Sequence, residues 1–338
     1  MKPNNILITG GAGFIGSNFV ELVVENSQDQ IYVLDSLTYA GNLKNLEAVS
    51  QKSNYTFIKG DICDVQLIDD LFKKYNFNKV VHFAAESHVD NSITGPGAFI
   101  QTNIVGTFNL LQSAYKLWMN GPNDLKNEFN EARFLHVSTD EVYGTLGETG
   151  LFLETTPYAP NSPYSASKAS SDFIVRSYFH TYGMPVVTTN CSNNYGKHQH
   201  KEKLIPTIIR KAISGEVIPI YGNGKNIRDW IYVTDHCKGI KLVLDKGRLG
   251  ETYNIGGRNE RENLYIAHTI CDLLDGLVPS EKPYKEQMEF VQDRAGHDFR
   301  YAIDADKIES ELGWKAEENF ESGILKTIEW YLNHKDQL

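Results

Sequence analysis

Two pairs of polar residues in the middle of the chain have the types and spacing of an acid–base site. Asp140 and Glu141 directly follow an apolar run that starts at Phe134, and burying adjacent carboxyls is unfavourable unless partners or function compensate. Tyr164 and Lys168 are four residues apart just after a proline, which predicts that they share one face of a helix. A lysine ammonium beside a phenol favours the phenolate and lowers the tyrosine pKa. We therefore expect Tyr164 to act as a general base and Lys168 as its electrostatic partner.

A glycine-rich turn near the N-terminus has the pattern of a dinucleotide site. The short apolar strand predicted at 6–9 is followed by Gly10, Gly13 and Gly16, and then by a helical pattern over 17–25. Glycine at these positions permits a tight turn and lets backbone N–H groups approach a pyrophosphate at the start of the helix. Tyrosine–lysine pairs with this spacing also occur on ordinary surfaces, so the glycine turn is what favours a catalytic interpretation.

The acid that follows the next strand indicates which dinucleotide is bound. A strand predicted at 31–34 leads to Asp35, roughly twenty residues past the last glycine, where a carboxylate can bind the adenosine ribose. A carboxylate there would repel a 2′-phosphate, so we expect the cofactor to be NAD rather than NADP. Another strand, at 55–60, leads to Asp61 and Ile62, which are placed to meet the adenine.

Alternation of strands and helical segments predicts an α/β fold with a doubly wound, Rossmann-like parallel sheet. A strand at 79–83 leads to Ala84, Ala85 and Glu86, and small residues at the carboxyl end of a parallel strand suit a cofactor crevice. Three further segments are expected to form two helices and a loop, at 65–75, 98–118 and 121–131 respectively.

The helix that carries Tyr164 and Lys168 is expected to end near Tyr182, where Gly-Met-Pro follows. We predict a first domain at residues 1–190 that binds NAD and carries the catalytic residues. We predict a smaller C-terminal lobe at 191–338 that mainly binds the substrate, with some segments returning to the first domain.

The C-terminal half contains shorter elements and basic segments. His198 and His200 alternate like metal ligands, but without a third ligand nearby a solvated loop is the better interpretation, and no metal is expected. Three Arg-bearing segments read as loops, and each alone could form a structural salt bridge. Together they would suit a diphosphate, which arginine binds with paired hydrogen bonds; they are 228–230, 261–263 and 293–298.

The composition limits the classes of function. A formal net charge of −10 over 338 residues argues against binding to nucleic acid or to an anionic membrane. The N-terminal apolar run is too short for a signal peptide and no stretch approaches a membrane span. The four cysteines show no paired spacing, which indicates reduced thiols in a cytoplasmic protein.

The motifs together resemble those of the extended short-chain dehydrogenases/reductases, and more narrowly the dTDP-glucose 4,6-dehydratases along nearly the whole chain. The broad resemblance is carried by the glycine turn and the Tyr164–Lys168 pair. The narrower one is carried by segments 34–42, 84–93, 138–144, 162–172, 192–196, 202–206, 228–236, 253–257, 293–298 and 300–304. Lys197 and Lys201 depart from the family, which often has proline there.

The resemblance implies a hydro-lyase reaction on dTDP-glucose in three stages. Tyr164 would take the proton of the 4-hydroxyl while hydride passes from carbon 4 to NAD, with Lys168 lowering the tyrosine pKa and Thr139 bonding the 4-oxygen. Glu141 would then remove the proton on carbon 5, and Asp140 as a neutral acid would protonate the departing 6-hydroxyl. Hydride would then return to carbon 6 and a proton to carbon 5, which would give dTDP-4-keto-6-deoxyglucose and restore oxidised NAD.

The resemblance also implies binding residues, a homodimer and a place in deoxysugar biosynthesis such as that of dTDP-rhamnose. The dimer is expected to form through the helices at 98–118 and 165–182. NAD would be held by Gly10, Gly13, Phe14, Ile15, Gly16, Asp35, Thr38, Asp61, Ile62, Ala84, Ala85, Glu86, Thr102, Tyr164, Lys168 and Asn194. The nucleotide sugar would be held by Ser87, Thr139, Asn193, Lys203, Leu204, Pro219, Tyr221, Arg228, Asn263, Arg294, His297 and Tyr301.

Two other interpretations are compatible with part of this pattern. A nucleotide-sugar 4-epimerase or decarboxylase of the same fold shares the glycines and the tyrosine–lysine pair but needs no acid pair after the strand at Phe134. A non-catalytic NAD-binding module would have no need for Asp140, Glu141, Tyr164 and Lys168 to occur in one chain. The adjacent Asp140 and Glu141 therefore favour dehydration.

Overall fold

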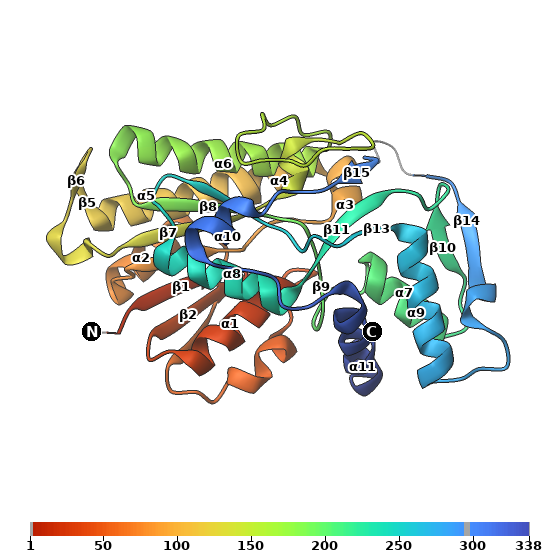
Figure 1. Cartoon of the computed structure of the whole chain (residues 1–338). Coiled ribbons are helices and arrows are strands. Elements are labelled where there is room, and N and C mark those ends of the chain that lie inside the picture. The colour runs from red at the N-terminus through yellow and green to blue at the C-terminus, as the bar shows by residue number, and fades with distance from the viewer. Residues whose placement is uncertain (1–2, 294–297, 338) are drawn as a thin grey trace.

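The centre of the molecule is a seven-stranded sheet in which each neighbouring pair of strands is parallel (Figure 1). The computed structural model describes residues 3–293 and 298–337. The strand order is β12-β8-β7-β4-β1-β2-β3. The strands are β1 (Asn5–Thr9), β2 (Gln30–Asp35), β3 (Tyr55–Lys59), β4 (Lys79–His82), β7 (Arg133–Thr139), β8 (Val186–Cys191) and β12 (Thr252–Ile255). This sheet and its flanking helices confirm the predicted doubly wound, Rossmann-like fold.

Helices cover both faces of the sheet (Figure 1). Successive side chains of a strand point to opposite faces, so each face has its own hydrophobic core. Ile6 and Ile8 of β1 pack in the core beneath α1 (Phe14–Asn26) and α8 (Val233–Lys246). Leu7, between them, packs in the opposite core. Three helices cover that second face: α2 (Val65–Tyr75), α5 (Thr107–Trp118) and α6 (Pro163–Tyr182).

The long helix α6 is bounded by local sequence signals. Ser162 and Ser165 form a reciprocal capping box, and Pro163 occupies the first helical turn, where its missing N–H leaves no helical hydrogen bond unmade. Gly183 ends the helix at φ 67°, a left-handed conformation that glycine adopts without steric penalty. An N-cap side chain such as that of Ser162 is typically worth about 1 kcal/mol. The predicted end of this helix near Tyr182 is confirmed.

A second group of elements forms the C-terminal part of the molecule around its own apolar cluster. A four-stranded sheet contains β9 (Asn193–Tyr195), β11 (Ile227–Tyr232), β13 (Glu260–Glu262) and β15 (Arg300–Tyr301), and β10 (Ile218–Tyr221) pairs with β14 (Met288–Val291). The helices here are α7 (Leu204–Ile213), α9 (Asn263–Leu277) and α11 (Phe320–Asn333). The chain returns to the large sheet at β12, and α10 (Asp306–Leu312) then packs beside that strand.

Two sequence expectations about local structure are wrong, and a third is confirmed. The segment expected to be a loop at 121–131 contains part of a small hairpin, β5 (Met119–Gly121) with β6 (Asp124–Leu125), and a 3-10 turn. The helical stretch expected at 98–118 is confirmed, and it consists of the end of α4 (Pro96–Phe99), a π-helical segment (Ile100–Gly106) and α5. Residues 228–230 and 261–262 lie in strands β11 and β13 rather than in loops, because these two strands pair with each other.

Short helical segments complete the description, namely α3 (Val89–Thr94) and 3-10 turns at 43–49, 140–143, 284–287 and 335–337. Within the described residues, no helix has both the length and the apolar character that crossing a bilayer requires.

Candidate active site

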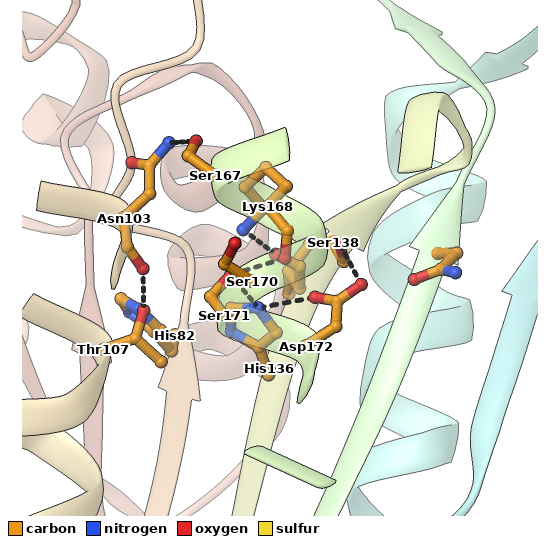
Figure 2. A network of polar contacts seen from close by, with 12 residues as sticks. His82, Asn103, Thr107, His136, Ser138, Ser167, Lys168, Ser170, Ser171 and Asp172 are labelled. Atoms are coloured by element: carbon orange, nitrogen blue, oxygen red, sulfur yellow. Dashed lines mark hydrogen bonds and ion pairs between the residues drawn. The ribbon is translucent and has the colours of Figure 1, made fainter. Parts of the chain in front are cut away.

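Strand β7 and helix α6 together position the tyrosine–lysine pair. The Lys168 Nζ donates a hydrogen bond to the carbonyl of Val137 at 2.8 Å, as Figure 2 shows for the lysine and its surroundings. Two residues further along the strand, Thr139 hydrogen-bonds the Tyr164 side chain. Both Tyr164 and Lys168 are buried. The predicted shared helix face is therefore observed, and it faces the carboxyl end of the strand.

The pKa of Tyr164 differs in direction from the sequence prediction. Burial raises the pKa of this phenol well above its usual value, and the nearby Glu141 carboxylate raises it further. The hydrogen bond with Thr139 acts in the opposite direction. The expected lowering by Lys168 is thus wrong for the protein without ligands, because desolvation of the phenolate outweighs the other contributions.

The two adjacent acids have different surroundings. They lie in the 3-10 turn Asp140–Tyr143 that directly follows β7. Asp140 is 1% exposed, and burial followed by the charges of Glu141 and Asp229 raises its pKa well above the usual range. Glu141 is only partly buried and lines the same cleft. The raised pKa favours the protonated form of Asp140, which equips it to donate a proton beside a second carboxyl group.

The glycine turn between β1 and α1 packs so closely against neighbouring backbone that two of its positions have no room for a side chain. Gly10 has φ +70°, and a Cβ there would lie 2.6 Å from the backbone nitrogen of Ala84. A Cβ on Gly16 would lie 2.2 Å from the carbonyl oxygen of Gly10. The turn therefore requires glycine at both positions, and it leads directly into the N-terminus of α1, where backbone N–H groups favour an anion.

Asp35 ends β2 next to this turn and organises the backbone around it. Its Oδ2 accepts a hydrogen bond from the backbone N–H of Ala12 at 2.9 Å, and its Oδ1 accepts one from that of Leu37 at 2.8 Å. The carboxylate also lines the cleft above the sheet. A ribose with two free hydroxyls fits beside this negative charge, whereas a phosphorylated ribose does not.

One continuous cleft of about 320 Å³ collects most of the predicted residues. The predicted NAD-binding residues all line it. So do the predicted catalytic residues Thr139, Asp140 and Glu141 and three predicted substrate residues, Ser87, Asn193 and Lys203. The Lys203 Nζ donates to the carbonyl of Ser87 at 3.1 Å, which joins two segments more than a hundred positions apart.

Several predicted substrate residues lie outside this lining. Arg228 is buried, donates to the carbonyls of Asp298 and Phe299, and lies over the ring of Tyr301 with its guanidinium carbon 4.3 Å from the centroid. Leu204, Pro219, Tyr221 and Asn263 do not line the cleft either. Arg294 and His297 fall outside the described residues.

Arg228 and Tyr301 nevertheless lie close enough to influence the acid pair. Arg228 acts to lower the pKa of Asp140, against the larger effect of burial. Glu141 contributes to the raised pKa of Tyr301. The sheet β11–β15 therefore places these two residues at the border between the acid pair and the C-terminal elements.

The segment 197–200 is not the solvated loop expected from the sequence. Gln199 is buried and donates to the carbonyl of Asn194 at 2.8 Å. His198 packs against Trp330, with ring centroids 4.9 Å apart. His200 lines the cleft instead. The contact with α11 buries this polar segment, and local sequence contains no signal for it.

Other cleft residues were not predicted from the sequence. Cys191 is the last residue of β8 and Ser192 follows it, and Val137 and Ser138 precede the acid pair. Their position at the carboxyl ends of two central strands is a general signal for a crevice residue, and it could have identified them.

Comparisons with known proteins agree over nearly the whole chain. The family described as GDP-mannose 4,6 dehydratase matches residues 7–327. A dTDP-glucose 4,6-dehydratase of Xanthomonas campestris pv. campestris is 56% identical over 331 residues, which is 97% of this chain and 93% of that protein.

Solved structures of similar proteins carry the same fold. A dTDP-glucose 4,6-dehydratase from Streptomyces venezuelae, with NAD and the ligand TYD bound, has a TM-score of 0.89 and 43% identity, covering 98% of each chain. One from Bacillus anthracis, in complex with NAD, has a TM-score of 0.86 and 44% identity, again covering 98% of each chain.

Proposed function

The chain belongs to the nucleotide-sugar 4,6-dehydratase family, and on that premise we propose how its residues divide the reaction. It is an NAD-dependent enzyme, a hydro-lyase, that converts dTDP-glucose to dTDP-4-keto-6-deoxyglucose. The observation that supports our assignment of roles is the placement of Asp140 and Glu141. A buried neutral acid and a partly exposed acid follow β7 directly and share one cleft with Tyr164.

The glycine turn and Asp35 fit NAD. The turn has no room for side chains at Gly10 and Gly16, and Asp35 stands where the adenosine ribose would lie. The bound cofactor supplies a hydride acceptor that also returns the hydride. Asp61 and Ile62 line the adenine end of the cleft, and Thr102 and Asn194 line it elsewhere.

Tyr164 takes the proton of the sugar 4-hydroxyl in this proposal. Its raised pKa makes the phenolate a strong base, which the Lys168 ammonium and the Thr139 hydroxyl stabilise when it forms. Thr139 lies between the phenol and the acids, so it can also bond the 4-oxygen. The buried position of all three side chains keeps water away from the proton being moved.

Glu141 and Asp140 carry out the elimination. Oxidation at carbon 4 acidifies the proton on carbon 5, and Glu141 removes it. Asp140 donates its proton to the hydroxyl leaving carbon 6, so that water departs and a double bond forms between carbons 5 and 6. Because Asp140 is protonated and Glu141 is the more exposed acid, the pair can perform opposite tasks at one pH.

We assign binding of the nucleotide end of the substrate to the C-terminal lobe, residues 191–338. Lys203 and Asn193 line the cleft from that lobe, and Ser87 of the first domain lines it where its carbonyl accepts from Lys203. Arg228, stacked on Tyr301, and Asn263 at the start of α9 do not line the cleft and are assigned to the nucleotide end by the family resemblance. The remaining assignments in this part are Leu204, Pro219, Tyr221, Arg294 and His297, and the domain at 1–190 holds NAD and the reacting groups.

We propose further that the enzyme is a homodimer that works in the cytoplasm on the route to a deoxysugar such as dTDP-rhamnose. Exposed apolar side chains support a dimer through the α5–α6 face, where Ile100, Phe108 and Phe173 are 54%, 44% and 58% exposed. All four cysteines are free thiols, which suits a reducing compartment.

Isotope transfer separates dehydration from epimerisation. Deuterium placed on carbon 4 of dTDP-glucose is expected on carbon 6 of the product, with the proton on carbon 5 taken from solvent. An epimerase would return the label to carbon 4. Mixing labelled substrate with unlabelled substrate that carries a second isotopic tag tests whether transfer stays within one molecule. Scrambled label in the mass spectrum would refute the single-site mechanism.

A further inference from the structure

A buried carboxylate lies behind the tyrosine–lysine pair and has no role in the steps above. Asp172 follows Lys168 by one turn of α6 and is 5% exposed. Its Oδ2 accepts hydrogen bonds from Ser138 Oγ at 2.8 Å and from Tyr158 OH at 3.0 Å. The Nε2 of His136 lies 3.0 Å from its Oδ1. Figure 2 shows this carboxylate between α6 and β7, on the lysine side of the helix.

Consecutive residues of β7 hold the functional residues of α6. The carbonyl of Val137 accepts a hydrogen bond from the Lys168 ammonium. The hydroxyl of the next residue, Ser138, donates a hydrogen bond to Asp172. Thr139, the third in this series, bonds the Tyr164 side chain. Three consecutive residues of β7 thus fix the position of Asp172 relative to Lys168 and Tyr164.

The groups that face Asp172 are neutral apart from Lys168. Burial lowers the pKa of His136 far below its usual value, and it does the same for His82, whose ring centroid is 5.3 Å from that of His136. Burial raises the pKa of Tyr158, so this phenol keeps its proton. From β8, Cys191 also stays protonated, since burial raises its thiol pKa. Within the described residues that surround it, the carboxylate therefore faces one positive charge, that of Lys168.

We infer that Asp172 is a further positioning residue of the reaction, whose carboxylate supplies the counter-charge that keeps the buried Lys168 as an ammonium. This inference rests on the proposed roles of Tyr164 and Lys168. An ammonium in an apolar interior releases its proton unless an opposite charge is near. Without its proton, Lys168 could not stabilise the Tyr164 phenolate, and oxidation at carbon 4 would slow. Asp172 acts through Lys168 and does not touch the sugar.

The electrostatic effects on the two groups are reciprocal. Burial lowers the pKa of Lys168, and the charge of Asp172 is the largest influence that raises this pKa. Burial raises the pKa of Asp172 to about 7, and Lys168 is the largest influence that lowers it. At pH values above about 7 the carboxylate is ionised and the counter-charge is present.

The pH dependence of Asp172→Asn tests the inference directly. In single turnovers, absorbance of reduced nicotinamide reports the oxidation at carbon 4. In the wild type, the oxidation rate should fall at high pH, where Lys168 loses its proton. Asp172→Asn should lower the pH of this fall by at least one unit, which is a tenfold change in the protonation equilibrium of Lys168. A uniform reduction at every pH would indicate a structural role and would overturn the inference.

Thermal unfolding across pH gives a readout that does not depend on activity. The folded-state pKa of Asp172 is raised above the unfolded value, so its protonated form stabilises the fold at low pH and this stability is lost as pH rises through about 7. Asp172→Asn should lack that decline. Tyr158→Phe, which removes one donor to the carboxylate, should move the decline to higher pH and keeps the test valid if Asp172→Asn does not fold.

Two comparisons make the outcome specific. Asp235→Asn also removes a buried carboxylate, one that accepts from the backbone N–H groups of Glu317 and Glu318, and it should leave the alkaline limit in place. Tyr164→Phe should abolish the oxidation itself. If Tyr164→Phe oxidises substrate normally, the proposed roles fail; if only Asp172→Asn keeps the wild-type limit, the present inference alone is wrong.

Discussion

Asp140→Asn should separate elimination from oxidation. Asp140 is almost completely buried, and its raised pKa favours the protonated form. The amide has nearly the same shape, and its oxygen can keep the contact with Thr139 Oγ1, which lies 3.4 Å from Asp140 Oδ1. The change therefore removes an acidic proton without altering local charge, so neither the fold nor the charge near Tyr164 should change appreciably.

The expected loss follows from the role of a general acid. Removing one typically lowers the rate by about two to four orders of magnitude, which corresponds to about 3–5 kcal/mol of barrier. Oxidation at carbon 4 should remain within a few fold of wild type, because Tyr164, Lys168 and Thr139 are unchanged. Reduced nicotinamide should consequently accumulate, and exchange of the carbon-5 proton with solvent should continue.

Stopped-flow absorbance of reduced nicotinamide, followed by product analysis, measures both steps in one sample. In the wild type, elimination should also fall as pH rises through the raised pKa of Asp140, since the protonated form is present below that value. If Asp140 were ionised in the wild type, its replacement would remove a negative charge beside Glu141 and Tyr164 and would change the oxidation rate. A change of only a few fold in elimination, or an equal change in both steps, would refute the assignment.

Other substitutions test the remaining roles. Glu141→Gln should abolish both carbon-5 exchange with solvent and elimination, with a loss of about two to four orders of magnitude measured by deuterium incorporation and product formation; retained exchange would exclude Glu141 as the base. Tyr164→Phe should leave bound NAD oxidised when dTDP-glucose is added, and a normal rise in reduced-nicotinamide absorbance would contradict its role. Denaturation of the purified enzyme should release NAD, and recovery of NADP would contradict the role of Asp35. Phe173→Glu should shift the protein from dimer to monomer in sedimentation, because it places a charge on the exposed apolar face of α6, and an unchanged dimer would place the interface elsewhere.

Much of the fold could be predicted because its signals are local. The glycine turn, the strand before it and Asp35 lie within one short segment, and the limits of α6 are set by Ser162, Pro163 and Gly183. Hydrophobic runs of strand length, separated by helical periodicity, indicate a doubly wound sheet before any contact is known. The parallel order then places the carboxyl ends of β1, β4, β7 and β8 at one edge, so the residues that follow them line one cleft.

The sequence left undecided whatever depends on burial by distant parts of the chain. The helix spacing placed Tyr164 beside Lys168, yet the tertiary structure buries the phenol and raises its pKa where proximity to lysine alone predicted a decrease. The segment 197–200 is polar and is expected in solvent, but α11 packs against it through Trp330. Arg228 became a strand residue because β13 and β15 pair with β11.

Asp172 illustrates the same division. The sequence places it one turn after Lys168, a spacing that is common on exposed helices. Only the packing of α6 on β7 surrounds it with Ser138, Tyr158 and His136 and removes water from both charges. Helix spacing follows from neighbouring residues, whereas desolvation depends on everything packed around a group. For this reason the sequence by itself determined which groups could react, and the tertiary structure decided their charge.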